Sequence, residues 1–142
     1  MPIFDISNII DRDVIKFDLL EEEYFISLVK NRYPFYGTQI GYRNLVGSIF
    51  FEFENDFNKK KVINFFEEII ERQEISEDIY FLGDSATDKV LHCAVKDFSK
   101  VLDALLNIPQ HYYIMPHGGD WIMIFTLSMA AFGYAQKPAG RA

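Results

Sequence analysis

Apolar residues recur every three to four positions in three segments, a spacing typical of amphipathic helices. The clearest helix is predicted to begin after Asn55 and Asp56, which offer N-caps, and to end at Arg72. Its buried stripe is predicted to consist of Val62, Phe65, Phe66, Ile69 and Ile70. A second helix is predicted from Leu19 to Asn31, ended by Pro34, and a third from Phe98 to Leu106, stopped by Pro109.

Shorter apolar runs between these segments predict strands. Residues Leu45 to Glu54 alternate, with Ile49, Phe51 and Phe53 on one face, and indicate a half-buried strand. Strands Ile79–Leu82 and Val90–Val95 are expected to pair across the turn between them. The later runs His111–Met115, Trp121–Leu127 and Ala131–Ala135 predict an antiparallel meander. The stretch Tyr33–Asn44 holds proline, two glycines and polar residues, so we expect a loop.

The order of these elements predicts a single α/β domain of the α+β kind, with a mixed, mainly antiparallel sheet and about three packed helices. A chain of 142 residues with 49% hydrophobic residues has the size and composition of one soluble globular domain. We assign residues 1–136 to this domain. Residues 137–142 are short, polar and unpatterned, which indicates a disordered tail or a cloning remnant.

Cysteine content and apolar run lengths favour a cytoplasmic protein. Cys93 is the single cysteine, so no disulfide can form within the chain. Acidic and basic residues interrupt the first thirteen positions, unlike the apolar core of a signal peptide. The longest apolar run, residues 121–135, is shorter than the about 20 residues that cross a bilayer. The sequence therefore predicts no association with a membrane.

The net charge of −7 is concentrated in the first part of the chain. Residues 1–78 contain 16 acids and 9 bases, whereas residues 79–142 contain 5 of each. Such a surface repels nucleic acid and attracts basic partners, although the same charge could serve solubility alone. The acidic residues predicted to contact a partner are Glu21, Glu22, Glu23, Glu67, Glu68, Glu71, Glu74 and Asp78.

Residues with catalytic or ligand-binding chemistry do not form a recognisable motif. His92 and Cys93 are neighbours on a predicted strand, so their side chains point to opposite faces, and we expect Cys93 to be buried and inert. His111, His117 and Asp120 could supply metal ligands, but their spacing matches no metal motif, and residues 117–120 favour a turn. The glycine pairs lack a phosphate-binding pattern, and Lys59–Lys61 favours a solvated helix face. We therefore predict no catalytic residue, no cofactor and no bound metal.

Residues 79–135 carry a pattern of strand motifs. It consists of Tyr80-Phe-Leu-Gly-Asp84, a helix, Ile108-Pro-Gln-His-Tyr-Tyr-Ile114, Trp121-Ile-Met-Ile-Phe-Thr126 and Phe132-Gly133. This pattern resembles bacterial immunity proteins of polymorphic toxins, including contact-dependent growth inhibition systems. The family commonly has a polar, glycine-containing turn after the threonine, where this chain has Leu127-Ser-Met-Ala130. The shared motifs mark strands, so the resemblance transfers no catalytic residue.

The resemblance implies a protein that binds the C-terminal domain of a cognate toxin, commonly a nuclease, in a one-to-one complex and blocks it. Aromatic residues of the predicted loop, Tyr33, Phe35, Tyr36 and Tyr42, would then be either interface anchors or core residues. A small-ligand or regulatory domain with a pocket beneath the aromatic strands is the alternative. A metal-dependent enzyme would need His111, His117 and Asp120 to converge.

Overall fold

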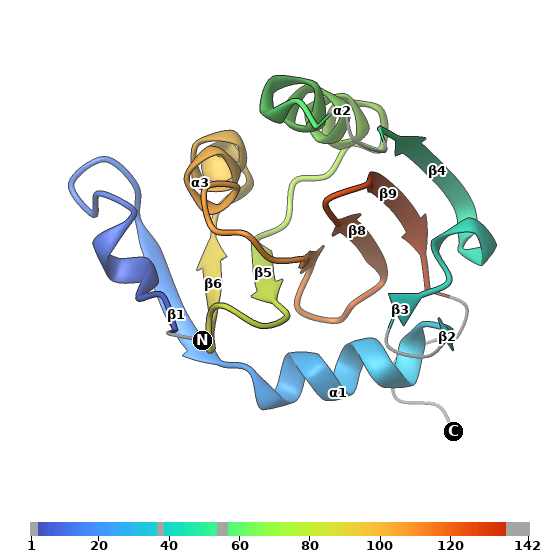
Figure 1. Cartoon of the computed structure of the whole chain (residues 1–142), viewed down its shortest axis with the longest axis horizontal. Helices are drawn as coiled ribbons and strands as arrows, with labels where there is room; N and C mark the ends of the chain where they lie inside the picture. The colour runs from blue at the N-terminus through green and yellow to red at the C-terminus, as the bar shows by residue number, and fades with distance from the viewer. Residues whose placement is uncertain (1–2, 37–38, 54–56, 136–142) are drawn as a thin grey trace.

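A seven-stranded antiparallel sheet forms the middle layer of the protein (Figure 1). The computed structural model describes residues 3–36, 39–53 and 57–135. The order of the strands across the sheet is β1-β6-β5-β7-β8-β9-β4. Their bounds are Phe17–Glu21 (β1), Val46–Glu52 (β4), Ile79–Gly83 (β5), Lys89–Cys93 (β6), Tyr112–Met115 (β7), Trp121–Phe125 (β8) and Met129–Tyr134 (β9).

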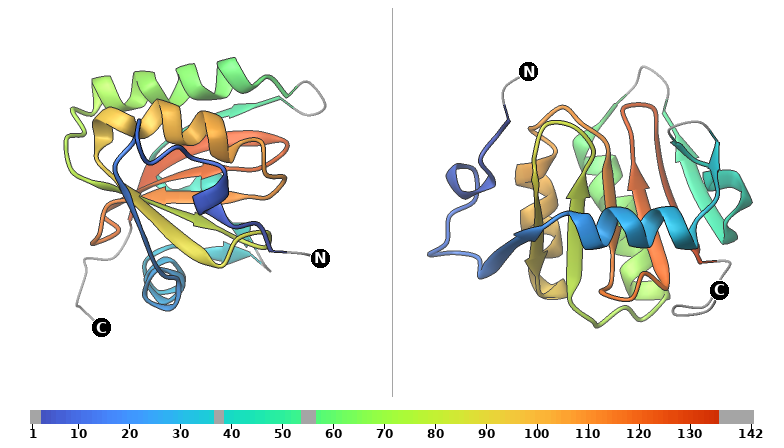
Figure 2. Two further views of the ribbon diagram at one scale, coloured as in Figure 1. Left: turned by 90° about the vertical axis from the view of Figure 1, so that its left-hand side faces the viewer. Right: turned by 90° about the horizontal axis from the view of Figure 1, so that it is seen from below.

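Helices cover both faces of this sheet. Helix α1, Glu23–Arg32, crosses one face, and helices α2, Lys59–Arg72, and α3, Phe98–Leu105, lie together on the other (Figures 1 and 2). The predicted single α+β domain is therefore confirmed, with every strand pair of the large sheet antiparallel. The predicted β5–β6 pairing and the β7–β8–β9 meander are confirmed as well.

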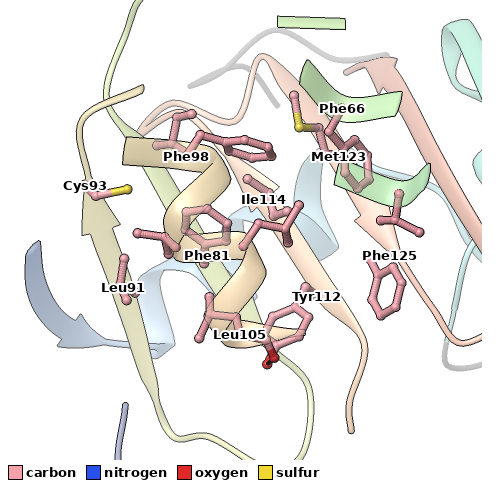
Figure 3. Close-up of a cluster of buried hydrophobic side chains, with 14 of the residues drawn as sticks. Phe66, Phe81, Leu91, Cys93, Phe98, Leu105, Tyr112, Ile114, Met123 and Phe125 are labelled. Carbon is pink, nitrogen blue, oxygen red and sulfur yellow. Dashed lines mark hydrogen bonds between the residues drawn. The ribbon is translucent and has the colours of Figure 1, made fainter. Parts of the chain in front are cut away.

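Two apolar clusters account for the three layers. The larger cluster fills the space between the sheet and α2 and α3, with Phe66, Phe98 and Phe81 among its fully buried side chains (Figure 3). The smaller cluster lies under α1, where Phe25 and Val29 pack on the opposite face of the same strands. Every residue of β7 and β8 is buried, because alternate side chains enter alternate clusters. Both faces of the sheet therefore need a covering layer.

Helix α2 begins where a side chain caps it. Asn58 Oδ1 accepts a hydrogen bond from the backbone N–H of Lys61 at 3.1 Å. The predicted capping residues Asn55 and Asp56 lie outside the described residues. Val62, Phe66 and Ile69 are the fully buried members of the predicted stripe, which confirms this amphipathic helix.

The predicted helix Leu19–Asn31 is wrong at its beginning. Residues Phe17 to Glu21 form β1, which pairs with β6 and places Phe17 opposite Cys93, and α1 begins only at Glu23. Phe17 and Leu19 point into the larger cluster, so the two-residue alternation of a strand decides this segment. The glutamates that suggested a first helical turn are therefore divided between a strand end and a helix start.

The predicted loop Tyr33–Asn44 is also partly wrong. It contains a two-stranded hairpin, β2 at Phe35–Tyr36 and β3 at Gln39–Ile40, followed by a 3-10 helix at Tyr42–Asn44. Next to it, edge strand β4 has an irregular register between Val46 and Ile49. Ile49 pairs with Phe132 but is 39% exposed, while Phe53 reaches the larger cluster as predicted.

The β5–β6 turn is held by a buried glutamine. Gln110 Oε1 accepts hydrogen bonds from the backbone N–H groups of Ser85, at 3.2 Å, and Ala86, at 2.7 Å. Its amide nitrogen donates to Thr87 Oγ1 at 2.9 Å. A side chain that is 3% exposed thus satisfies its polar atoms and fixes the turn that carries Asp84 and Asp88.

The close approach of Gly133 to Leu45 gives a test of this packing. A Cβ atom at Gly133 would overlap Leu45 Cβ, whereas a Cβ atom at Gly118 would meet no atom within 4 Å. We expect Gly133→Ala to lower the free energy of unfolding by roughly 1–3 kcal/mol, because the overlap sits beside the backbone. Urea unfolding measures the change, and Gly118→Ala is the matched control. Equal stability of both variants would contradict the packing described.

Candidate functional site

The acidic residues predicted to bind a partner lie in two separate places. Glu21, Glu22 and Glu23 stand where β1 ends and α1 begins, whereas Glu67, Glu68 and Glu71 belong to α2. The sheet lies between α1 and α2 (Figure 1). The structure therefore does not bring the two predicted groups together, and each must be judged as a surface of its own.

Part of the charge on α2 is already used in local contacts. Glu67 Oε2 accepts a hydrogen bond from Ser99 Oγ of α3 at 2.5 Å, and Glu68 pairs with Arg72 at 2.9 Å. Glu71 is exposed. Glu74 follows the helix with a φ of 52°, so its backbone adopts the left-handed conformation that often ends a helix. On this face, at least two of the predicted carboxylates act in helix packing or helix stability.

The carboxylates at the beginning of α1 form a denser group. We use the name acidic edge for the seven acids along β1 and the chain segments beside it, which are Asp18, Glu21, Glu22, Glu23, Asp78, Asp84 and Asp88. Burial raises the pKa of Glu22, and the nearby charges of Glu23, Asp88 and Glu21 raise it further. Lys89 partly offsets them through an ion pair with Glu21 at 2.5 Å. The group retains an excess of negative charge.

An apolar cleft opens beside the acidic edge. It has a volume of about 310 Å³ and is lined by Ile26 and Val29 of α1 and by Leu82 and Tyr113 of the sheet. Glu22, Lys30 and Asp84 also line it. A binding partner would gain affinity from apolar contact with the floor of this cleft, and speed and selectivity of association from its charged walls.

The far end of the acidic edge is organised around His92. Its Nε2 lies 2.8 Å from Asp78 Oδ2, and its Nδ1 lies 3.5 Å from Asp18 Oδ2. The His92 ring stacks on Tyr80, with centroids 4.5 Å apart, and Tyr80 in turn stacks on Phe25 of α1. This chain of contacts joins β1, β6, β5 and α1, so the carboxylates on it are held in place.

Helix α1 is fixed to the β7–β8 turn at its other end. Arg32 donates hydrogen bonds to the Gly118 carbonyl at 2.6 Å and to Asp120 Oδ1 at 2.7 Å. Tyr33 Oη donates to the Gly119 carbonyl at 2.6 Å. Gly119 has a φ of 70°, which confirms the predicted turn and explains a glycine there. The position of α1, and of the acids at its start, is therefore set by contacts over its whole length.

The aromatic residues of the predicted loop Tyr33–Asn44 differ in how deeply they are buried. Tyr33 is 4% exposed and burial raises its pKa, so it is a core residue and not an interface anchor. Tyr42 is half-buried and packs edge-on against Phe50, a 40% exposed side chain of edge strand β4. Phe35 and Tyr36 lie in β2, and their side chains lie outside the described part of the structure.

The residues considered for catalysis or metal binding have separate partners. His111 Nδ1 lies 3.2 Å from Asp84 Oδ2, His117 stacks on Tyr24, and Asp120 pairs with Arg32. In residues 3–36, 39–53 and 57–135, no three His, Cys, Asp or Glu side chains are grouped so that they could hold a metal ion. The convergence that a metal-dependent enzyme would need is thus not found among these residues.

Cys93 lies in the larger apolar cluster (Figure 3). Its neighbour His92 points to the other face of β6, where its ring stacks on Tyr80. This placement is the one predicted from the alternation of strand side chains. Burial, followed by the charges of Asp97 and Asp78, raises the pKa of the thiol to about 12. The thiolate that a nucleophilic cysteine requires is therefore strongly disfavoured.

Comparison with known proteins adds no assignment to this surface. No protein-family model matches the chain, and no curated protein matches its sequence. Within the described part of the chain, no helix is long and apolar enough to cross a membrane. The chemistry of the surface itself therefore carries the functional argument.

The crowding around Glu22 predicts a pH-dependent stability. Because its pKa is raised in the folded state, ionisation of Glu22 disfavours folding as the pH rises through that pKa. At acidic pH the group is protonated in both states and the cost is absent. We expect Glu22→Gln to stabilise the protein at neutral pH and low salt by at most about 0.5 kcal/mol after solvent screening.

The melting temperature measured against pH and salt checks this expectation. Glu71→Gln removes an exposed carboxylate from α2 and shows whether loss of any negative charge has the same effect. A Glu22→Gln stabilisation that persisted at pH 3, or that Glu71→Gln matched, would contradict the electrostatic origin.

The buried thiol predicts protection from thiol reagents. With a pKa of about 12 and 2% exposure, Cys93 should react with a disulfide reagent at pH 8 about a hundredfold or more slowly in the folded protein than in urea. Absorbance of the released thiolate measures both rates on the same sample. Comparable rates would mean that the β6 end opens readily.

Proposed function

We propose that the protein is an immunity protein that binds a cognate toxin domain in a one-to-one complex and neutralises it without catalysis. The observation that carries this proposal is the acidic edge beside an apolar cleft, next to a helix α1 that is anchored at its far end by Arg32. Such a surface fits a basic protein domain better than a nucleic acid or an anionic membrane. A basic nuclease domain is the partner class that we favour.

The crowded carboxylates supply the first support. Burial raises the pKa of Glu22 most, and repulsion from the nearby charges of Glu23, Asp88 and Glu21 raises it further in the unbound protein. A basic partner would relieve this repulsion, so the cost of keeping the charges together would be recovered on binding. Charge complementarity of this kind raises association rates from about 10⁵–10⁶ M⁻¹s⁻¹ towards 10⁸–10⁹ M⁻¹s⁻¹ at low salt.

The toxin as the class of partner is supported by the resemblance of residues 79–135 to immunity proteins of polymorphic toxins. In the structure these residues run from β5 to the end of β9 and contribute the cleft residues Leu82 and Tyr113. An immunity protein of this kind would act in the cytoplasm, where a delivered toxin domain reaches its substrate. The acidic edge would then occupy the basic groove that otherwise holds nucleic-acid phosphates.

The alternative of a small-ligand domain has less support. It requires a pocket beneath the aromatic strands, but the side chains of β7 and β8 are buried and packed into the two apolar clusters. The cleft beside α1 is lined by Tyr113 of β7 and Leu82 of β5, but it lies over the β5 end that leads into Asp84 and not beneath β8. Space for a ligand under these strands would require one cluster to open.

Co-expression tests the proposed function. The toxin to be used is the C-terminal domain encoded by the large open reading frame next to this gene, expressed in bacteria with and without the protein. We expect growth to be rescued and a one-to-one complex to co-purify. Toxicity without rescue, together with separate elution of the two proteins, would overturn the proposal and favour the ligand-binding alternative.

Matched charge reversals locate the interface. One variant carries Glu22→Lys, Glu23→Lys and Asp88→Lys on the acidic edge, and the other carries Glu67→Lys, Glu68→Lys and Glu71→Lys on α2. Both change the net charge equally, so a purely global effect would slow both alike. We expect the first variant to slow toxin association at low salt about tenfold or more, and the second about threefold or less. Stopped-flow fluorescence measures the rates, and the opposite ranking would place the interface on α2.

A further inference from the structure

A second cleft lies at the other end of β1, where the acidic edge ends. It has a volume of about 510 Å³, and its charged lining consists of Arg12, Lys16, Asp18, Asp78, Lys96 and Asp97, together with His92. Phe17 and Cys93 contribute apolar walls. The cleft is open to solvent and carries both signs of charge, so what matters is which of its charged groups lacks a partner.

The carboxylate of Asp97 is a hydrogen-bond acceptor of the cleft without a side-chain partner. Its side chain lines the cleft but is only 8% exposed. No side chain in the described part of the chain donates a hydrogen bond to it or forms an ion pair with it. It stands at the N-cap of α3 without a side-chain cap hydrogen bond. The oxygens of Asp97 therefore remain available to a hydrogen-bond donor.

Of the other charged groups of the cleft, Asp18, Asp78, His92 and Arg12 have contacts of their own, whereas Lys16 and Lys96 are exposed to solvent. His92 bridges Asp18 and Asp78 through its two ring nitrogens. Arg12 donates from Nη1 to the Phe17 carbonyl at 3.1 Å and lies over the Phe17 ring at 4.1 Å. A hydrogen-bond donor that enters the cleft would therefore find in Asp97 a buried carboxylate that can still accept hydrogen bonds.

The chemistry of the cleft fits a cation that donates hydrogen bonds. The described residues hold no group of three ligands that could bind a metal ion. A guanidinium group suits the site because its planar fork donates two parallel hydrogen bonds to one carboxylate. It is also more weakly hydrated than an ammonium group, so it enters a partly buried site at lower cost.

We propose that this cleft receives the guanidinium group of an arginine side chain of the partner protein, which pairs with Asp97. This inference rests on the proposed function, because the arginine belongs to the toxin. Strand β1 spans five residues, so the cleft lies about 13 Å along the sheet edge from the acids at the beginning of α1. An interface of ordinary size, about 800 Å² on each partner, covers both.

A small mimic tests the cleft without the toxin. N-acetyl-arginine amide carries one guanidinium group and no backbone charge, and N-acetyl-citrulline amide is its neutral analogue of nearly the same shape. We titrate each into ¹⁵N-labelled protein and follow the amide signals. Saturable shifts at Asp97, Lys96 and His92 are expected with the arginine compound and not with the citrulline compound.

Two variants make the test specific. Asp97→Asn keeps a good N-cap residue for α3 and should weaken binding of the arginine compound about tenfold or more. Asp103→Asn, on the exposed side of the same helix, should leave it unchanged. Absence of shifts, equal shifts with the citrulline compound, or full binding by Asp97→Asn would each overturn the inference.

The toxin complex separates this inference from the proposed function. If the complex forms but Asp97→Asn binds the toxin as tightly as the unaltered protein does, the proposed function stands and the assignment of this cleft fails. If the arginine compound binds but no toxin complex forms, the partner as the source of the arginine is overturned together with the proposed function. A complex weakened by Asp97→Asn and not by Asp103→Asn supports both.

Discussion

The burial of β7 and β8 on both faces decides the arrangement of the rest of the chain. Strands of this kind must be covered on each side, so α2 and α3 are needed on one face and α1 on the other. Because α1 crosses a whole face, it is anchored at the β7–β8 turn through Arg32 and Tyr33. The acids at its beginning are thereby brought beside the β5–β6 turn, and the acidic edge follows from the need to bury the sheet.

Local patterns predicted most of the fold, because most of its elements have a clear period of their own. The stripe of α2 and the meander β7–β8–β9 were readable from residue spacing alone. The segment Leu19–Glu21 was not, because two adjacent leucines and a run of glutamates fit a helix as well as a strand. Its pairing with β6, some seventy residues away, decides between them, and such a contact leaves no local signal.

The candidate surface was predicted in composition but not in arrangement. The excess of acids in the first part of the chain correctly indicated a negatively charged surface, yet it could not show that the sheet separates Glu22 from Glu71. Asp84 and Asp88 were missed because they lie in the balanced second part of the chain and join the group only through the β5–β6 turn. Asp97 gave no signal either, since a lack of partners is a property of the folded chain alone.

Each edge strand of the sheet pairs with a strand that is synthesised much later. Strand β1 pairs with β6, and β4 pairs with β9, so neither early strand has its neighbour until these later residues have left the ribosome. The nascent chain therefore carries two unpaired strands and an uncovered α2 for most of its translation, and it closes only after Tyr134 emerges. A chain that stopped before Met129 would therefore leave β4 without its neighbour, so the sheet can be completed only when nearly all of the described residues are present.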